Sequence, residues 1–108
     1  MSDHLYRIDT FIVPESSQAV FLEKVYQTHG VLAQCRGFVR DIVVRKMTND
    51  SECRIVTVVE WTDQTAMDAA KDVIGEIHRS DGFSPPEFFE KLGIEADLAL
   101  YEDAEISF

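Results

Sequence analysis

The chain has 108 residues, of which 45% are hydrophobic and 28% are charged. This length supports one cooperative core, so we expect a single domain over residues 1–108. The 20 acidic residues outnumber the 10 basic ones and give a formal charge of -10 at pH 7. Such a chain repels polyanions, which argues against a nucleic acid as its partner.

Membrane and secretory readings find no support in the sequence. No apolar run approaches the length that crosses a bilayer, and the first residues, Met1 to His4, lack the basic-then-apolar pattern of a signal peptide. We therefore expect a cytoplasmic protein with no membrane partner. Cys35 and Cys53 fit no metal-ligand spacing and are interpreted as free, partly buried thiols.

The first half of the chain predicts a strand and then a helix. Leu5 to Val13 is rich in β-branched and aromatic residues, and Pro14, which has no N–H to donate to a ladder, follows it. A helix is expected from Ser16 or Ser17 to about Arg36, before Gly37. Its apolar residues recur at helical spacing, as Phe21, Leu22, Val25, Tyr26, Leu32 and Cys35.

The second half predicts a hairpin, two helices and a last strand. Strands over 38–47 and 54–61 flank a polar turn, so they form an antiparallel hairpin. Asp63 can cap a helix that runs to about Ser80. Ser84, Pro85 and Glu87 predict a capping box at the start of a short third helix. Gly93 ends that helix, and residues 94–102 form the last strand.

This order of elements predicts an α+β, ferredoxin-like βαββαβ sandwich with an antiparallel four-stranded sheet and an extra short helix before the last strand. Two long helices can cover only one face of the sheet. The segment 55–59 (Ile-Val-Thr-Val-Val) is nevertheless apolar on both faces, and no other segment remains to cover the second face. We therefore expect a homodimer in which two copies of the sheet pack face to face.

Short segments along most of the chain resemble a known family. They are the first strand, Phe-Leu-Glu-Lys-Val-Tyr-Gln-Thr-His over 21–29, Gly37-Phe38, Val-Val-Glu-Trp over 58–61, Gly82-Phe83 and Leu92-Gly93-Ile94. Together these segments resemble the antibiotic biosynthesis monooxygenase (ABM) domain of the dimeric α/β barrel superfamily. The resemblance implies a pocket between the sheet and its own helices. Better understood members use it to oxygenate polyphenols, quinols or anthrones without a metal or flavin.

His29 is the candidate catalytic base. Oxygenation without a cofactor requires a deprotonated, electron-rich substrate, and hence a base in a mostly apolar pocket. His29 falls seven residues after Leu22 and three after Tyr26, on the helix face expected to look into the pocket. Histidine titrates near neutrality, which suits a base. The other interpretation is a core histidine whose hydrogen bonds are satisfied by a neighbour.

Three further residues are candidates for substrate binding. Tyr26 and Trp61 could stack on an aromatic ring while each offers a hydrogen bond, although both could equally be core residues. His78 follows Ile74 by four residues and lies at the edge of the second helix's apolar stripe. We expect it near the pocket mouth. The other interpretation is that it is an ordinary half-exposed residue with no role in binding.

Charged and polar residues inside the strands are a further signal. Asp9, Thr10, Arg40, Asp41 and Thr57 alternate with apolar neighbours, so some of them must face the pocket or the paired sheets. Buried charges need partners. We therefore expect Arg40 or Arg45 to pair with Asp9, Asp41 or Asp97 at the interface.

Three functions follow from these observations. The leading one is a cofactor-independent monooxygenase that acts on a small electron-rich aromatic, such as a quinol, anthrone or polyphenol. The second is a non-catalytic module that binds a small apolar molecule or only dimerises. The third is haem binding or degradation. The family's haem-degrading branch has an asparagine in the first strand, a tryptophan in the second helix and a histidine at its end. Here only His78 approximates that set.

Overall fold

The computed structural model describes residues 3–104, which form a four-stranded antiparallel sheet with three α-helices. The strands lie in the order β2-β3-β1-β4. The bounds are β1 Leu5–Pro14, α1 Gln18–Leu32, β2 Phe38–Met47, β3 Glu52–Trp61, α2 Gln64–Asp81, α3 Pro85–Leu92 and β4 Glu95–Glu102, with a short 3-10 turn, η1, over Glu15–Ser17. The predicted ferredoxin-like α+β fold, with its extra helix before the last strand, is confirmed.

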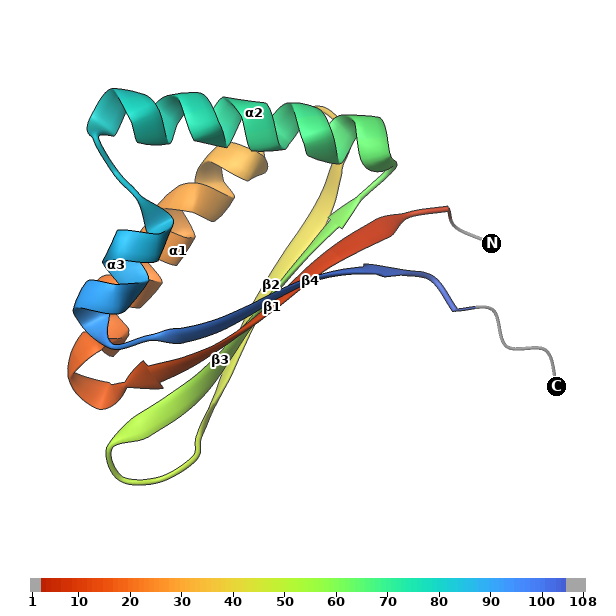
Figure 1. The fold of residues 1–108 in the computed structure, drawn as a ribbon. Coiled ribbons are helices and arrows are strands. Elements are labelled where there is room, and N and C mark those ends of the chain that lie inside the picture. The colour runs from red at the N-terminus through yellow and green to blue at the C-terminus, as the bar shows by residue number, and fades with distance from the viewer. Residues whose placement is uncertain (1–2, 105–108) are drawn as a thin grey trace, which may run out of the picture.

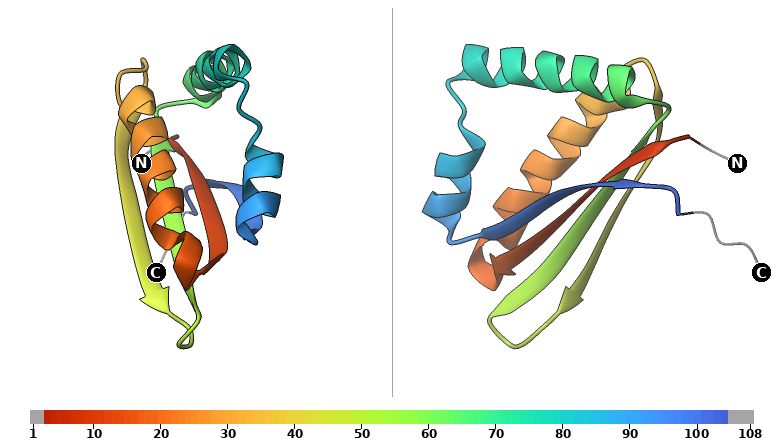
Figure 2. Two further views of the ribbon diagram at one scale, coloured as in Figure 1. Left: turned by 90° about the vertical axis from the view of Figure 1, so that its left-hand side faces the viewer. Right: turned by 45° about the vertical axis from the view of Figure 1, so that its right-hand side comes forward.

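All three helices lie on one side of the sheet (Figures 1 and 2). Figure 1 shows α1 rising along the sheet, α2 crossing near one end of α1 and α3 beside the other end. The predicted first helix extends about four residues too far. After Leu32 the chain tightens into i→i+3 turns, in which Gln34 N–H donates to the Val31 carbonyl and Cys35 N–H to the Leu32 carbonyl. Gly37 then takes a positive φ of 85°, which favours glycine.

The two predicted helix caps differ in the structure. The carboxylate of Asp63 accepts a hydrogen bond of 2.8 Å from Ala66 N–H, as predicted. The Ser84 side chain makes no cap hydrogen bond, so the predicted capping box at α3 is wrong. The first turn of α3 is instead closed by the backbone, because Phe88 N–H donates to the Ser84 carbonyl over 2.9 Å.

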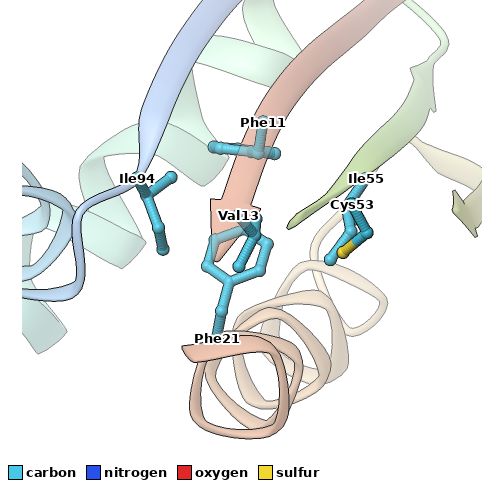
Figure 3. Packing of buried hydrophobic residues seen from close by; sticks show 6 residues of the cluster. All are labelled: Phe11, Val13, Phe21, Cys53, Ile55 and Ile94. Atoms are coloured by element: carbon cyan, nitrogen blue, oxygen red, sulfur yellow. The ribbon is translucent and has the colours of Figure 1, made fainter. Parts of the chain in front are cut away.

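The main core fills the end of the helix-covered face that is nearest α3 and the start of α1 (Figure 3). The rings of Phe11 and Phe21 meet there with centroids 4.8 Å apart. The buried members of this cluster are Phe11, Val13, Phe21, Cys53, Ile55 and Ile94. A smaller cluster of Val59, Trp61 and Ala70 lies under α2. Both cysteines are free thiols, with Cys53 buried and Cys35 half-buried.

The other face of the sheet is also apolar, and none of the helices within residues 3–104 covers it. The register aligns Ile8, Val58 and Ile42 across three neighbouring strands, and Val56 pairs with Val44 in the adjacent row. Ile42 and Val44 are 41% and 51% exposed. We call these five residues the open face. Within residues 3–104, no helix is long and apolar enough to cross a membrane.

Candidate functional site

A cavity of about 280 Å³ lies between the sheet and the helices. Apolar side chains form much of its wall, and they come from four elements: Phe11, Val59, Trp61, Met67 and Phe89. A smaller hollow of about 150 Å³ adjoins it, and the two share His29, Thr57, His78 and other wall residues. The sheet and helices therefore enclose a space that suits a small, mostly apolar molecule.

His29 lies in the wall of both spaces, near the C-terminal end of α1. The residue is only 8% exposed. Its ring Nδ1 is 2.8 Å from the Asp41 carboxylate of β2. An Nδ1–H that donates to this carboxylate fixes the tautomer and leaves Nε2 with a free lone pair. The His29–Asp41 pair is thus an oriented imidazole at the cavity wall, which can accept a proton.

Trp61 also lies in the cavity wall, at the end of β3. It is 2% exposed, and its ring meets the Phe38 ring edge-on at a centroid distance of 5.9 Å. Packing against Val59 and Ala70 holds it in the core cluster under α2. Trp61 therefore serves the core and the cavity wall together, so the two interpretations of this residue do not exclude each other.

His78 lines both spaces from the last turns of α2. Its ring packs on Phe83 with centroids 4.9 Å apart, and Lys24 Nζ lies 3.9 Å from the centre of that same phenylalanine ring. Burial, together with the charge of Lys24, lowers the pKa of His78. The neutral imidazole is therefore favoured at this end of the cavity.

Tyr26 is not brought to the cavity. It is 61% exposed and lines neither space. Phe21, Val25 and His29 are spaced by four residues and form the inward stripe of α1. Tyr26 follows Val25 by one residue, a turn of about 100° around the helix, which directs it away from this stripe.

The expected pairs of arginine with aspartate do not form among residues 3–104. Arg40 instead bonds Glu60 on the open side of the sheet, and Arg45 bonds the amide of Gln18. Asp41 is the partner of His29. Register places Asp9, Asp41 and Arg45 on the helix-covered face, away from the expected interface between sheets. Arg40 and Asp97 lie on the open side, and their pairing between two copies stays a prediction.

Asp9 and Arg7 are wall residues that the sequence analysis did not assign to the site. Both line the cavity from β1, and Arg7 Nη2 donates to Asp9 Oδ1 over 3.3 Å. Burial raises the pKa of Asp9, and the charge of Arg7 offsets this only in part. The period of two along β1 places Arg7, Asp9 and the buried Phe11 on one face, which was the available signal.

A larger hollow of about 750 Å³ lies elsewhere, between the end of α1 and the start of α2. Small and apolar side chains line much of it, and none of the four candidate residues does. The carboxylate of Asp63, which borders it, already caps α2. We place the candidate site in the smaller cavity because the oriented imidazole lies there.

Comparison with known proteins adds to this geometry. The sequence matches no family model and no curated protein. Among solved structures, SnoaB, a cofactor-independent oxygenase from Streptomyces nogalater, is 20% identical with a TM-score of 0.68, and 97% of each chain is covered. A dimeric ferredoxin-like protein from an uncultured marine organism is 15% identical with a TM-score of 0.66, over 96% of this chain and 98% of that one.

A third similar structure is a variant of MhuD with two manganese protoporphyrin IX molecules bound per active site. It is 15% identical with a TM-score of 0.67, over 96% of this chain and 98% of the other. Candidate antibiotic biosynthesis monooxygenases from Bacillus cereus and Nitrosomonas europaea also match over nearly the full chain. At these identities the likeness establishes the fold: this chain has the ferredoxin-like fold of the ABM-type monooxygenases.

Proposed function

We propose that the protein is a homodimeric, cofactor-independent monooxygenase that acts on a small electron-rich aromatic such as a quinol, anthrone or polyphenol. The observation that carries this proposal is His29, a buried imidazole oriented by Asp41 at the wall of a mostly apolar cavity. The fold shared with SnoaB, a cofactor-independent oxygenase, supports the same reaction class.

In this reaction Nε2 of His29 takes a proton from the bound aromatic, and the electron pair stays on the substrate. The electron-rich anion then reduces O₂. With an anthrone, one oxygen atom becomes the new ring carbonyl and the other leaves as water with the two hydrogens lost from carbon. Trp61 and Phe89 supply apolar wall against the bound substrate.

Oxygen uptake with a panel of hydroquinones and anthrones tests the enzyme proposal. Removal of a general base costs roughly 10²- to 10⁴-fold in rate, so His29→Ala should lose uptake on that scale. Asp41→Asn should lower uptake as well, because the amide no longer favours the imidazole tautomer that accepts at Nε2. Glu23→Gln, at an exposed position on α1, is the matched control and should keep full uptake.

The rival function is a non-catalytic module that binds a small apolar molecule. Wild-type protein that binds an aromatic but takes up no oxygen on any member of the panel would support this rival. Loss of uptake in His29→Ala counts for the enzyme only when the variant's melting temperature and oligomeric state equal those of the wild type.

Haem is a second candidate ligand, and His78 is the observation that favours it. The lowered pKa of this imidazole favours the neutral form that ligates metals, and MhuD shows a porphyrin-binding site on the same fold. Titration with haemin tests this function. A Soret shift that disappears in His78→Ala supports ligation through His78, and a shift that persists unchanged in the variant contradicts it.

A further inference from the structure

The cavity wall holds a second polar pair that the proposed proton transfer does not use. Arg7 and Asp9 lie two residues apart on β1, and their side chains are joined by a 3.3 Å hydrogen bond. Asp9 Oδ1 also accepts from the backbone N–H of Ala99 on β4, again over 3.3 Å. Both of these bonds are at the long end of the range for hydrogen bonds.

Arg7 has a donor that the protein leaves unused. Among residues 3–104, its Nε–H is buried and has no hydrogen-bond partner. A buried donor without a partner costs about 1–3 kcal/mol, and more when the group is charged. That atom is shielded from the cavity, but Arg7 lines the cavity and its side chain is 32% exposed, so the rest of the guanidinium can meet a ligand group there.

Arg7 borders two adjoining spaces. It lines the cavity that contains His29, and it also lines a hollow of about 310 Å³ between α2 and β4. Met67, Lys71 and Leu98 border both spaces as well. Arg7 therefore lies where the two spaces meet.

Only one side-chain acceptor is seen for Arg7 among residues 3–104, the Asp9 carboxylate, and that bond is long at 3.3 Å. His29 and Arg7 line the same cavity. The cavity thus combines a base with a guanidinium that can take a further acceptor. An anion formed on the ligand by proton loss would supply that acceptor.

We propose that Arg7 binds the phenolate or enolate oxygen of the ligand and stabilises it over the protonated form. This inference rests on the proposed function, because His29 is the base that creates the anion. In a phenol the O–H bond breaks, and in an enolisable ketone a C–H bond conjugated with the carbonyl breaks. In both cases the proton forms a bond to His29 Nε2, and the negative charge comes to lie on the oxygen that Arg7 contacts. The substrate class is then an aromatic whose acidic hydroxyl, or enolisable ketone, is directed at β1.

A coloured phenol tests this role in the full-length protein without any turnover. 4-Nitrophenol absorbs at longer wavelength when it is ionised, so its bound form can be titrated with pH by absorbance. With wild-type protein, the bound phenol should ionise at lower pH than the free phenol. In Arg7→Gln its titration should move up by about one pH unit or more, a tenfold or larger change in the ionisation constant.

Two further variants separate a specific role from general effects. Arg79→Gln removes an exposed arginine that pairs with Glu76 on α2, and it should leave the bound titration unchanged. Arg7→Lys keeps the charge without the Nε–H geometry and should give an intermediate shift, which also covers the case in which Arg7→Gln fails to fold.

The proposal is overturned if the bound phenol ionises at the same pH in wild type and Arg7→Gln, or if wild-type protein does not change the titration of 4-nitrophenol at all. Its failure can be told from failure of the proposed function. A shifted titration with no oxygen uptake on any substrate would remove the monooxygenase and keep Arg7 as an anion-binding residue. Oxygen uptake that depends on His29, together with an unshifted titration, would keep the monooxygenase and remove Arg7 as an anion-binding residue.

Discussion

The two faces of the sheet differ in what covers them and in which side chains they carry, although the same strands form both. On the covered face, aromatic and β-branched residues fill one end, and a smaller cluster packs under α2. The cavity with His29 and Asp9 in its wall borders both clusters. On the other face, the apolar residues of the open face lie in the middle, and a polar group of His4, Arg40 and Glu60 lies at one end. The covered face thus supplies the core and a candidate site, and the open face is the surface that we expect to associate with a second copy.

One carboxylate on each face shows how the environment decides ionisation. Burial raises the pKa of Asp9, whose two hydrogen bonds are long. The hydrogen bond with His4, and then the bond from Arg40, lower the pKa of Glu60 although it is also buried. Burial alone therefore does not fix the direction of the shift. The number and quality of the donors decide it.

The largest effect is expected for a charge placed on the open face. Val58 lies at its centre, half-buried and in register with Ile8 and Ile42. If two sheets pack face to face there, Val58→Asp buries an unpaired carboxylate, which costs several kcal/mol and should weaken the dimer by ~100-fold or more. Light scattering across micromolar concentrations should then find a folded monomer where the wild type is a dimer.

A matched variant on the other side of the molecule makes this test specific. Val20 lies on α1 and is 51% exposed, so Val20→Asp adds the same charge without touching the open face. It should remain dimeric. A wild-type chain that is monomeric at these concentrations, or equal dissociation in both variants, contradicts the assignment of this face to association.

Acid should destabilise the protein through Glu60. Because its folded-state pKa is below the ordinary value, the folded protein binds fewer protons here than the unfolded chain does. The stabilisation is present above the usual glutamate range and is lost as pH falls through the lowered pKa. Glu60→Gln should therefore be less stable than wild type at neutral pH, and the gap in urea midpoints should close in acid. A gap that stays constant with pH contradicts this.

Asp9 should give the opposite dependence. Because its folded-state pKa is raised, ionisation is disfavoured in the folded protein, and stability falls as pH rises from the ordinary aspartate range through the raised pKa. Asp9→Asn removes this penalty, so its stability relative to wild type should increase with pH over that window. Urea unfolding of both proteins from acid to neutral pH measures the trend. A difference in urea midpoint, variant minus wild type, that decreases as pH rises contradicts it.

The sequence was sufficient to predict elements and layers because their signals are local. The run over 55–59 showed that both faces of β3 are apolar, and the structure confirms a row of apolar residues on the uncovered side. His29 was placed toward the cavity from helical spacing and Trp61 from its place at a strand end, and both lie in the cavity wall. Tyr26 was misplaced because its spacing from neighbouring apolar residues also fits the edge of the helical stripe.

Only one of the two polar pairs of the site depends on pairing between distant strands. Asp41 reaches His29 only through the register of β2 on β3, and Arg7 reaches Asp9 within one strand. Charge alone suggested arginine partners for both aspartates. Fixing the register first, from the alternation of buried residues in β1 and β3, would have placed Arg7, Asp9 and Thr57 on the covered face.

The smallest predicted effect concerns how the helices that cover one face begin. Asp63 accepts a hydrogen bond from Ala66 N–H, so Asp63→Ala should cost about 1 kcal/mol. Ser84 precedes α3 in the same way but bonds nothing with its side chain, so Ser84→Ala should be close to neutral. Melting temperatures measure both changes, and they are taken at one fixed protein concentration because the proposed dimer would make them concentration-dependent. An equal loss in the two variants would mean that Ser84 caps α3 in solution, and the sequence pattern would then be the better guide to that helix.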